Sequence, residues 1–348
     1  MDRNKVTKAA EYFGRGLKDA QLLSGGLIHF TYKIDYDNNS SIVLQNINTN
    51  SFRQPENLVE NYHCIYNYLQ THQSEISIPE PLFTSDGKKF LTNESGFWRA
   101  TKFRDDCYAK TSMDDLKTAK ETANAFASFT YALRDLPAKD LLPVIPGFHD
   151  LSLRYRQFEE AEKAANGERL IQTEKLRREL KKRYLIVELF NEIELSPLCR
   201  LRIMHHDCKL SNVLFDKKTH RPTCIVDLDT TMPGYFFSDV GDMVRTMACS
   251  SNEEDREYEF VKVNKEMFFS VLEGYMDGIG KDLSEAERKL LKQSGLILIY
   301  MQALRFLTDY LNNDIYYQIK YPEHNFYRAM NQFSLLCSME NLLEEIIL

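Results

Sequence analysis

The sequence predicts an α+β protein with two lobes, a small β-rich N-terminal lobe and a larger, mainly helical C-terminal lobe. Three observations support this prediction. Short runs of β-branched and aromatic residues separated by turn residues fill the first hundred positions. Apolar residues recur at helical spacing from about residue 114 onward. A polar hairpin, residues 205–229, is embedded among the later helices. We therefore expect an N-terminal lobe at residues 1–103 and a C-terminal lobe at residues 104–348.

The N-terminal lobe begins with a predicted hairpin at residues 23–47, where two β-rich runs flank a turn rich in Asp, Asn and Ser. A helix is predicted from Pro55 to Gln70, because proline suits the first turn and apolar side chains follow at helical spacing. Further strands are expected at residues 81–84 and 97–101. These elements make the first lobe predominantly β.

Long helices dominate the C-terminal lobe in the prediction. The first runs from residue 113 to residue 133, and residues 154–190 are highly charged and helical in period. We interpret this charge run as a solvated helix face, with a docking surface as the alternative. The stretch IYMQALRFLTDYL, residues 299–311, is the most informative helix near the C-terminus.

The composition is that of a globular protein. The 348 residues are 43% hydrophobic and 12% aromatic, which suffices for ordinary cores. A formal net charge of −7 provides no overall basic field and argues against a nucleic-acid partner. The first residues lack an apolar signal segment, and the longest apolar run, residues 296–301, is too short for a bilayer. We expect a cytoplasmic protein without a membrane partner.

The seven cysteines indicate neither a disulfide framework nor a zinc site. They are scattered, their number is odd, and no CxxC pair occurs. Cys208 stands beside Asp207, but no activating base can be assigned to it. The sequence therefore does not favour a cysteine nucleophile.

The stretch HHDCKLSNVLFDKKTHRPTCIVDLD, residues 205–229, predicts a hairpin. Residues 213–215 and 224–226 are short runs of β-formers, and the residues between them are turn material. The two ends of a hairpin lie close together. We therefore expect Asp207 and Asn212, before the first strand, to converge with Asp227 at the end of the second.

This spacing, H-x-D-x-x-x-x-N followed by a later aspartate, meets the needs of phosphoryl transfer. Asp207 would act as the base that accepts the proton of a hydroxyl nucleophile. Asn212 and Asp227 would supply hard oxygen ligands for Mg²⁺ beside the phosphates of ATP. Each residue alone could merely cap a turn or end a strand, but the joint spacing and the hairpin favour a kinase.

Gly25 and Gly26 at the start of the first hairpin would let the backbone approach phosphate oxygens, so we predict that they bind the nucleotide. The surrounding SGGLIHFTY is not GxGxxG, and a plain hairpin turn is the alternative.

Several stretches resemble a known family. HHDCKLSNVLFD, CIVDLDTTMPG and SDVGDMVR are similar to the aminoglycoside phosphotransferase superfamily, whose protein-kinase-like fold acts on small molecules. LQNIN, VDLDTTMPG, MQALRFLTDYLNND and HNFYRAMNQF look more narrowly like the bacterial N-acetylhexosamine 1-kinases. The resemblance runs from about residue 20 to the C-terminus. It implies a small-molecule sugar substrate and transfer to the anomeric hydroxyl of GlcNAc or GalNAc.

The sequence departs from the broader kinase pattern at one position. The second strand of the first hairpin should end in a lysine, as in V-A-I-K, but here reads Ile-Val-Leu-Gln and ends at Gln45. Alternation places Val43 toward adenine and Gln45 toward phosphate. The lysine–glutamate pair that would link this strand to Glu60 on the next helix is therefore not expected. Backbone donors and Mg²⁺ would carry more of the phosphate charge.

Three further residues are predicted at the acceptor site. Arg305 and Asp309 lie one helical turn apart, either as a surface ion pair or, as the resemblance implies, as sugar-binding residues. Asp229, two residues beyond Asp227, would assist substrate or metal binding from the same strand face. Asp242 is expected to cap a helix or to brace the catalytic loop through its backbone.

Two alternatives remain at this point. A kinase for another small hydroxyl substrate, such as an aminoglycoside, an amino alcohol or a different sugar, would keep the same hairpin and change only the acceptor pocket. A non-catalytic nucleotide-binding pseudokinase is favoured slightly by the missing lysine and disfavoured by the joint presence of Asp207, Asn212 and Asp227. The sequence carries no signal for an oligomeric state.

Overall fold

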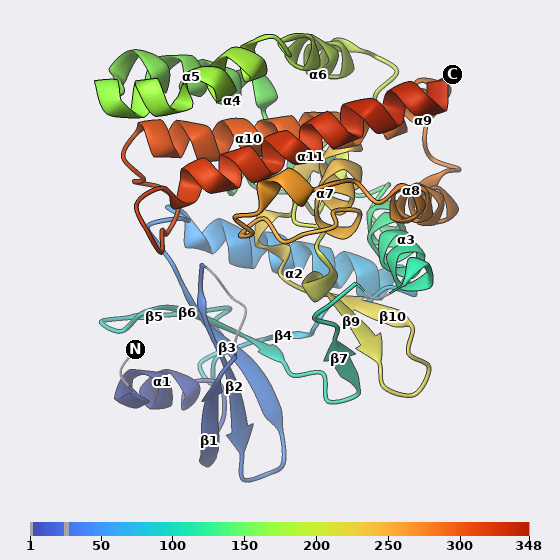
Figure 1. Ribbon diagram of the computed structural model, residues 1–348. Helices are drawn as coiled ribbons and strands as arrows, with labels where there is room; N and C mark the ends of the chain where they lie inside the picture. Colours follow the sequence, from blue (N-terminus) through green and yellow to red (C-terminus); the bar gives the residue numbers. More distant parts are fainter. Residues whose placement is uncertain (1–2, 24–27, 114, 348) are drawn as a thin grey trace. The chain divides into compact units, whose positions relative to one another are not determined.

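The computed structural model describes residues 3–23, 28–113 and 115–347. The chain forms two compact units; Figure 1 labels the helices and strands that they contain. Unit 1 comprises Met1–Lys110, Ala132–Pro146 and Asn212–Pro233, and unit 2 comprises Thr111–Tyr131, Gly147–Ser211 and Gly234–Leu348. The fold is α+β as predicted, with an antiparallel sheet in one unit and helices in the other. The lobe boundary after residue 103 stays a prediction.

An antiparallel sheet forms the centre of unit 1. Within the described residues it has six strands, in the order β1-β2-β3-β6-β4 with β5 paired to β6. The hairpin expected at residues 23–47 is confirmed as β2 and β3, whereas β1 was not predicted. The strands are β1 (Leu17–Leu22), β2 (Phe30–Tyr36), β3 (Ser41–Ile47), β4 (Pro81–Leu82), β5 (Leu91–Asn93) and β6 (Gly96–Lys102).

The sheet presents two different faces, because neighbouring residues of a strand point to opposite sides. Ile42 and Leu44 of β3 are buried with Trp98 and with apolar residues of helix α1 (Arg3–Ala10). Trp98, the single tryptophan of the sequence, is therefore a core residue. Val43 and Gln45 belong to the other face, where Gln45 stands opposite Arg99 of β6.

Helix α2 (Pro55–Thr71) follows the predicted bounds closely and begins with proline in its first turn. Its buried side chains include Leu58 and Val59, which join Ile47 and Phe97 of the sheet in one apolar cluster. The helix therefore packs on the sheet through the stripe that its spacing predicted.

A smaller sheet in unit 1 contains the predicted polar hairpin. In the described part of the chain it has three strands, in the order β10-β9-β7, and all of them are antiparallel. The strands are β7 (Cys107–Ala109), β9 (Val213–Asp216) and β10 (Pro222–Ile225). The hairpin formed by β9 and β10 confirms the expected strands and turn.

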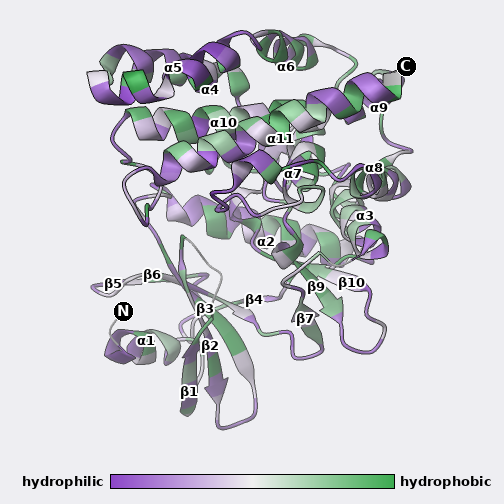
Figure 2. Ribbon diagram, viewed as in Figure 1, coloured by the Kyte–Doolittle hydropathy of each residue, from purple (hydrophilic) through white to green (hydrophobic). Residues whose placement is uncertain are grey.

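Helices α10 and α11 form the centre of unit 2, where α10 also contacts α4 and α7. Helix α10 is apolar over most of its surface (Figure 2), which is typical of a helix buried on all sides. The bounds are α3 (Leu116–Ala132), α4 (Leu151–Ala164), α5 (Gly167–Lys181), α6 (Leu185–Leu195), β8 (Arg202–Met204), β11 (Met232–Gly234), α7 (Phe237–Met247), α8 (Lys265–Ile279), α9 (Glu285–Leu290), α10 (Ser294–Leu311) and α11 (His324–Ile347).

The charged segment predicted at residues 154–190 is divided among α4, α5 and α6. Glu162 of α4 pairs with Arg177 and with Lys181 of α5, the latter at 2.5 Å. Several of the charges therefore link neighbouring helices instead of facing only water. Among the described residues, no helix is both long enough and apolar enough to span a membrane.

A buried ion-pair network joins β8 to α9 in unit 2. The guanidinium of Arg202 donates to both carboxylate oxygens of Glu287, at 2.6 and 3.0 Å, and its Nε donates to Asp282 at 2.7 Å. Glu287 is fully buried and also completes the capping box with Ser284 at the start of α9. Its loss would leave a buried arginine with an incomplete set of partners.

We predict that Glu287→Gln lowers the free energy of unfolding by about 3 kcal/mol, because breaking a buried pair leaves an uncompensated charge. Chemical denaturation would measure the change. The control is Glu285→Gln, which removes an exposed partner of Lys289 on the same helix and should leave stability unchanged. Equal effects of the two substitutions would contradict the prediction.

Candidate active site

The loop that carries Asp207 is held in unit 2 by two carboxylates of helix α7. The backbone N–H groups of His205 and His206 donate to the two oxygens of Asp239, at 3.1 and 2.8 Å. The N–H of Cys208 donates to Asp242 at 2.7 Å. The backbone on both sides of Asp207 is therefore fixed by charge-assisted hydrogen bonds.

Asp239 and Asp242 lie on one face of α7 because they are three residues apart. Asp242 also pairs with Arg245 at 2.9 Å. Burial nevertheless raises the pKa of the Asp242 carboxyl, against the opposing effect of Arg245. The bracing role expected for Asp242 agrees with this geometry. Asp239 was missed, although two acidic residues at i and i+3 near a helix start could have indicated it.

Asp207 itself remains accessible. Its side chain is 27% exposed, and one carboxylate oxygen accepts a hydrogen bond from Lys209 at 2.9 Å. His205 is fully buried, and its ring packs edge-on against Phe126. Burial raises the pKa of the Cys208 thiol well above its ordinary value, which agrees with the rejection of a cysteine nucleophile.

His206 adopts a left-handed backbone conformation, with φ of 66°. This conformation is costly for a non-glycine residue and is held by the surroundings. The His206 ring lies against Gly234, where an added Cβ would come within 2.5 Å of Cε1. Nδ1 of His206 lies 3.2 Å from Nδ1 of His149. Burial, together with His206 and Arg305, lowers the pKa of His149 well below its ordinary value.

The residues predicted to bind metal, Asn212 and Asp227, are brought together within unit 1 at the open end of the hairpin. The N–H of Val226 donates to the Asn212 carbonyl at 3.0 Å, which joins the two segments next to Asp227. Asn212 is 4% exposed, whereas Asp227 is exposed and has a φ of 62°. The metal-binding roles of both residues stay predictions.

An amide oxygen and a carboxylate are donors that suit Mg²⁺, which commonly binds one or two protein carboxylates and the phosphates of its substrate. Across the part of the chain that the structure describes, no three His, Cys, Asp or Glu side chains form a metal-binding group. Asn212 and Asp227 fit an ion that keeps water and phosphate oxygens as its remaining ligands.

Asp229 lies in a buried ion-pair cluster of unit 1. Its oxygens contact Nη2 of Arg99 at 2.5 Å and Nε2 of His29 at 2.8 Å. Burial alone would raise the pKa of the Asp229 carboxyl, but Arg99 and the hydrogen bond from His29 hold it below its ordinary value. The predicted contact of Asp229 with substrate or metal would have to compete with these partners.

Of the residues predicted to bind nucleotide, Val43 and Gln45 lie on β3 of the large sheet. Gln45 donates to Thr31 at 3.2 Å and accepts from Nε of Arg99 at 3.0 Å, and Val43 lies two residues earlier on the same strand face. Gly25 and Gly26 lie outside the described residues. Glu60, which a strand lysine would contact in the kinase pattern, pairs with Lys89 instead, at 2.6 Å.

Arg305 and Asp309 share α10 but have separate partners. The Arg305 guanidinium lies 5.2 Å from the Phe148 ring centroid and 5.7 Å from that of Tyr317. Asp309 accepts hydrogen bonds from the N–H groups of Tyr316 and Tyr317, at 2.8 and 2.9 Å, and from the Asn325 side chain at 2.9 Å. Asp309 therefore fixes the segment that brings Tyr317 to Arg305.

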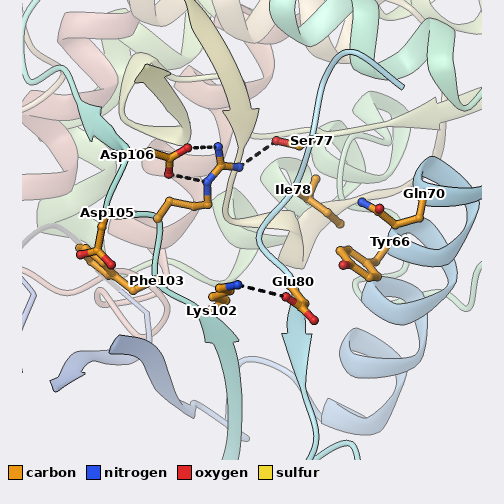
Figure 3. Close-up of a pocket in the computed structure, with 10 residues that line it drawn as sticks. Tyr66, Gln70, Ser77, Ile78, Glu80, Lys102, Phe103, Asp105 and Asp106 are labelled. Atoms are coloured by element: carbon orange, nitrogen blue, oxygen red, sulfur yellow. Dashed lines mark hydrogen bonds and ion pairs between the residues drawn. The ribbon is translucent and has the colours of Figure 1, made fainter. Parts of the chain in front are cut away.

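A hollow of about 450 Å³ in unit 1 is lined partly by residues 102–106 (Figure 3). From the sequence, the backbone of the segment 102–105, which links the two predicted lobes, is a candidate partner of adenine. Two of its cations are already paired, Lys102 with Glu80 at 3.8 Å and Arg104 with Asp106 at 2.8 Å. The Phe103 N–H donates to the Ser41 carbonyl at 3.1 Å. A nucleotide would therefore have to use other groups of this segment.

Comparison with known proteins adds a family match. Residues 19–261 match the model of the family described as "Phosphotransferase enzyme family". This match covers most of the chain, including both the loop around Asp207 and the hairpin of β9 and β10.

Solved structures support the fold. A microcompartment-associated aminopropanol kinase superposes with a TM-score of 0.67 and 16% identity, over 99% of this chain and 98% of that chain. An aminoglycoside phosphotransferase from Alicyclobacillus acidocaldarius superposes with a TM-score of 0.64 and 11% identity, over 98% of this chain and 96% of that chain. An amicoumacin kinase, solved in complex with AMP-PNP, Ca²⁺ and Ami, superposes with a TM-score of 0.65 and 11% identity, over 99% of this chain and 94% of that chain. At these identities the likeness shows the fold.

We predict that Asp309→Asn lowers the free energy of unfolding by about 2 kcal/mol, because an amide nitrogen would replace one of the oxygens that accept hydrogen bonds. Thermal and chemical denaturation would measure this. Asp277→Asn is the control, since Asp277 is a half-exposed carboxylate on α8 that pairs with Lys120. Unchanged stability of Asp309→Asn would show that the Tyr316–Tyr317 segment is held by other contacts.

Proposed function

The chain belongs to the phosphotransferase enzyme family, and we propose that it is an ATP-dependent kinase for the anomeric hydroxyl of an N-acetylhexosamine. The observation that carries this proposal is the catalytic loop. Asp239 and Asp242 hold its backbone, while the Asp207 carboxylate stays accessible beside Lys209. A fixed loop with an accessible carboxylate is what a hydroxyl nucleophile requires of its base.

In the proposed reaction the substrate hydroxyl donates its proton to Asp207, and its oxygen forms the new bond to the γ-phosphorus of ATP. The bond from that phosphorus to the β,γ-bridging oxygen breaks, and ADP leaves with the electron pair. The cation of Lys209 would compensate charge near Asp207. A hemiacetal hydroxyl is more acidic than an ordinary alcohol, so a weakly basic carboxylate is an adequate partner.

Asn212 and Asp227 would hold Mg²⁺, which supplies charge neutralisation at the phosphates when it is bound. Gly25 and Gly26 would offer backbone donors to the same phosphates, and Val43 and Gln45 would lie beside the nucleotide. The complex of the amicoumacin kinase with AMP-PNP and Ca²⁺ supports an adenine nucleotide and a divalent ion here.

The acceptor side of the proposal rests on residues of unit 2 near the catalytic loop. The Arg305 guanidinium lies near the Phe148 and Tyr317 rings, and the side chain of Arg305 is half-buried. Aromatic faces can pack against the C–H groups of a sugar, and a guanidinium fork can bind its oxygens. Asp309 would contribute through the segment that it fixes, and the similarity to hexosamine kinases supports the choice of sugar.

We predict that Asp207→Asn lowers kcat by about 10²- to 10⁴-fold, because the base is lost while the nucleotide contacts remain. Steady-state kinetics and MgATP titration by calorimetry would measure the two effects separately. Asp277→Asn on α8 should keep wild-type rates. A nearly normal kcat for Asp207→Asn would remove this residue from the role of base.

We also predict that GlcNAc or GalNAc yields a product whose phosphorus NMR signal couples to the anomeric proton. A 1-O-methyl glycoside should not react, because its anomeric oxygen has no proton to lose. Assays with an aminoglycoside and an amino alcohol separate the other acceptor classes. Phosphate at the sixth carbon, or turnover of the methyl glycoside, would eliminate the anomeric kinase and leave a kinase for another hydroxyl.

A further inference from the structure

Gln45 occupies the strand position at which the kinase pattern has a phosphate-binding lysine. The residue paired with Gln45 on the neighbouring strand is a buried cation. Arg99 of β6 is the register partner of Gln45 and is 5% exposed. Its Nε donates to Oε1 of Gln45 at 3.0 Å, and Nε2 of Gln45 donates to Thr31 at 3.2 Å. The positive charge of this part of the sheet is therefore supplied by the neighbouring strand.

Arg99 directs this charge to the segment that follows Asp227. Its Nη2 lies 2.5 Å from Asp229, which is 4% exposed and lies in a short helical turn, residues Leu228–Thr230. A buried carboxylate is stable only when it is paired. Asp229 therefore links the sheet to the backbone two residues beyond Asp227.

His29 is the second group against Asp229. Its Nδ1 accepts the backbone N–H of Asn48 at 3.0 Å, which leaves the proton of the neutral ring on Nε2, and Nε2 lies 2.8 Å from Asp229. The charge of Asp229 is consequently balanced by Arg99. The other anion of the kinase pattern, Glu60 on α2, is half-exposed and engaged by Lys89.

We propose that Arg99 is a positioning residue whose ion pair with Asp229 fixes the segment that contains Asp227. Gln45 orients the Arg99 guanidinium by accepting a hydrogen bond from its Nε. The Arg99–Asp229 pair would replace the ion pair between strand lysine and helix glutamate in other kinases. This inference rests on the proposed function, because it assumes that Asp227 binds a metal with the nucleotide. The left-handed backbone of Asp227, with φ of 62°, needs such support, since a non-glycine residue keeps this conformation only when neighbours impose it.

The test compares ATP affinity with Mg²⁺ and with EDTA by calorimetry, on the full chain and without any acceptor. The ratio of the two dissociation constants reports the contribution of the metal, whereas a general loss of structure would weaken both. Thermal unfolding is recorded for each variant. Arg99→Gln removes the cation, and Gln45→Lys/Arg99→Gln returns it from the opposite strand. Lys89→Gln is the matched control, because it breaks the Glu60 pair on the same unit.

We expect Arg99→Gln to lose about 10- to 100-fold of the Mg²⁺-dependent affinity, the range for groups that orient metal ligands. The double variant should regain most of it, and Lys89→Gln should stay within about twofold of the wild type. If Arg99→Gln does not fold, recovery of both folding and the Mg²⁺ effect in the double variant supports the same conclusion.

Two results would overturn the inference. One is a folded Arg99→Gln variant with an unchanged Mg²⁺ effect, and the other is a double variant that fails to recover folding or the Mg²⁺ effect. Absence of MgATP binding by the wild type would instead refute the proposed function itself. The two failures are thus distinguishable.

Discussion

The two carboxylates in the first half of helix α7 determine the conformation of the loop that precedes the hairpin. Buried backbone N–H groups must be paired, and the residues around Asp207 follow no regular strand or helix that would pair them. Asp239 and Asp242 accept these hydrogen bonds instead. Helix α7 packs against α10, the central helix of unit 2. The loop around Asp207 is therefore attached to the packed helices of that unit. A functional group placed on such a support needs little reorganisation before it acts.

Burial separates the aspartates near the site into two groups. Asp239, Asp242 and Asp229 are at most 4% exposed and accept hydrogen bonds or ion pairs from the protein. Asp207 and Asp227 remain open to solvent to a larger extent. A buried carboxylate that is already paired stabilises a conformation, whereas an exposed one can still bind a ligand or a proton. In the proposed function, aspartates would thus serve both to support the backbone and to carry out the chemistry.

Local patterns in the sequence were sufficient to predict the helices with a clear hydrophobic period and the hairpin with a clear turn. The hairpin of β9 and β10, helix α2 and helix α10 could be predicted because their patterns lie within a few consecutive turns or strands. Helix α1 and strand β1 were not predicted, since both are short and β1 carries three charged or polar residues in six. Their positions depend on packing against β2 and β3, which the local sequence does not encode.

The candidate site could be predicted only in part for a similar reason. The spacing of Asp207, Asn212 and Asp227 is visible in one stretch of chain. The partners of Asp229 and Asp309 are not, because they come from residues distant in sequence or from backbone groups. Arg99 has no motif of its own, and it becomes significant only through the β3–β6 register that places it opposite Gln45.

The contact between His206 and Gly234 limits which amino acids can occupy these two positions. A methyl group at position 234 would meet the imidazole, so an alanine there requires the His206 ring to shift or a smaller side chain to replace it. The two positions should therefore vary together in natural relatives, with glycine accompanying large rings and bulkier residues accompanying small side chains. A mutant library that aims to reshape the surroundings of Asp207 should therefore randomise positions 206 and 234 together.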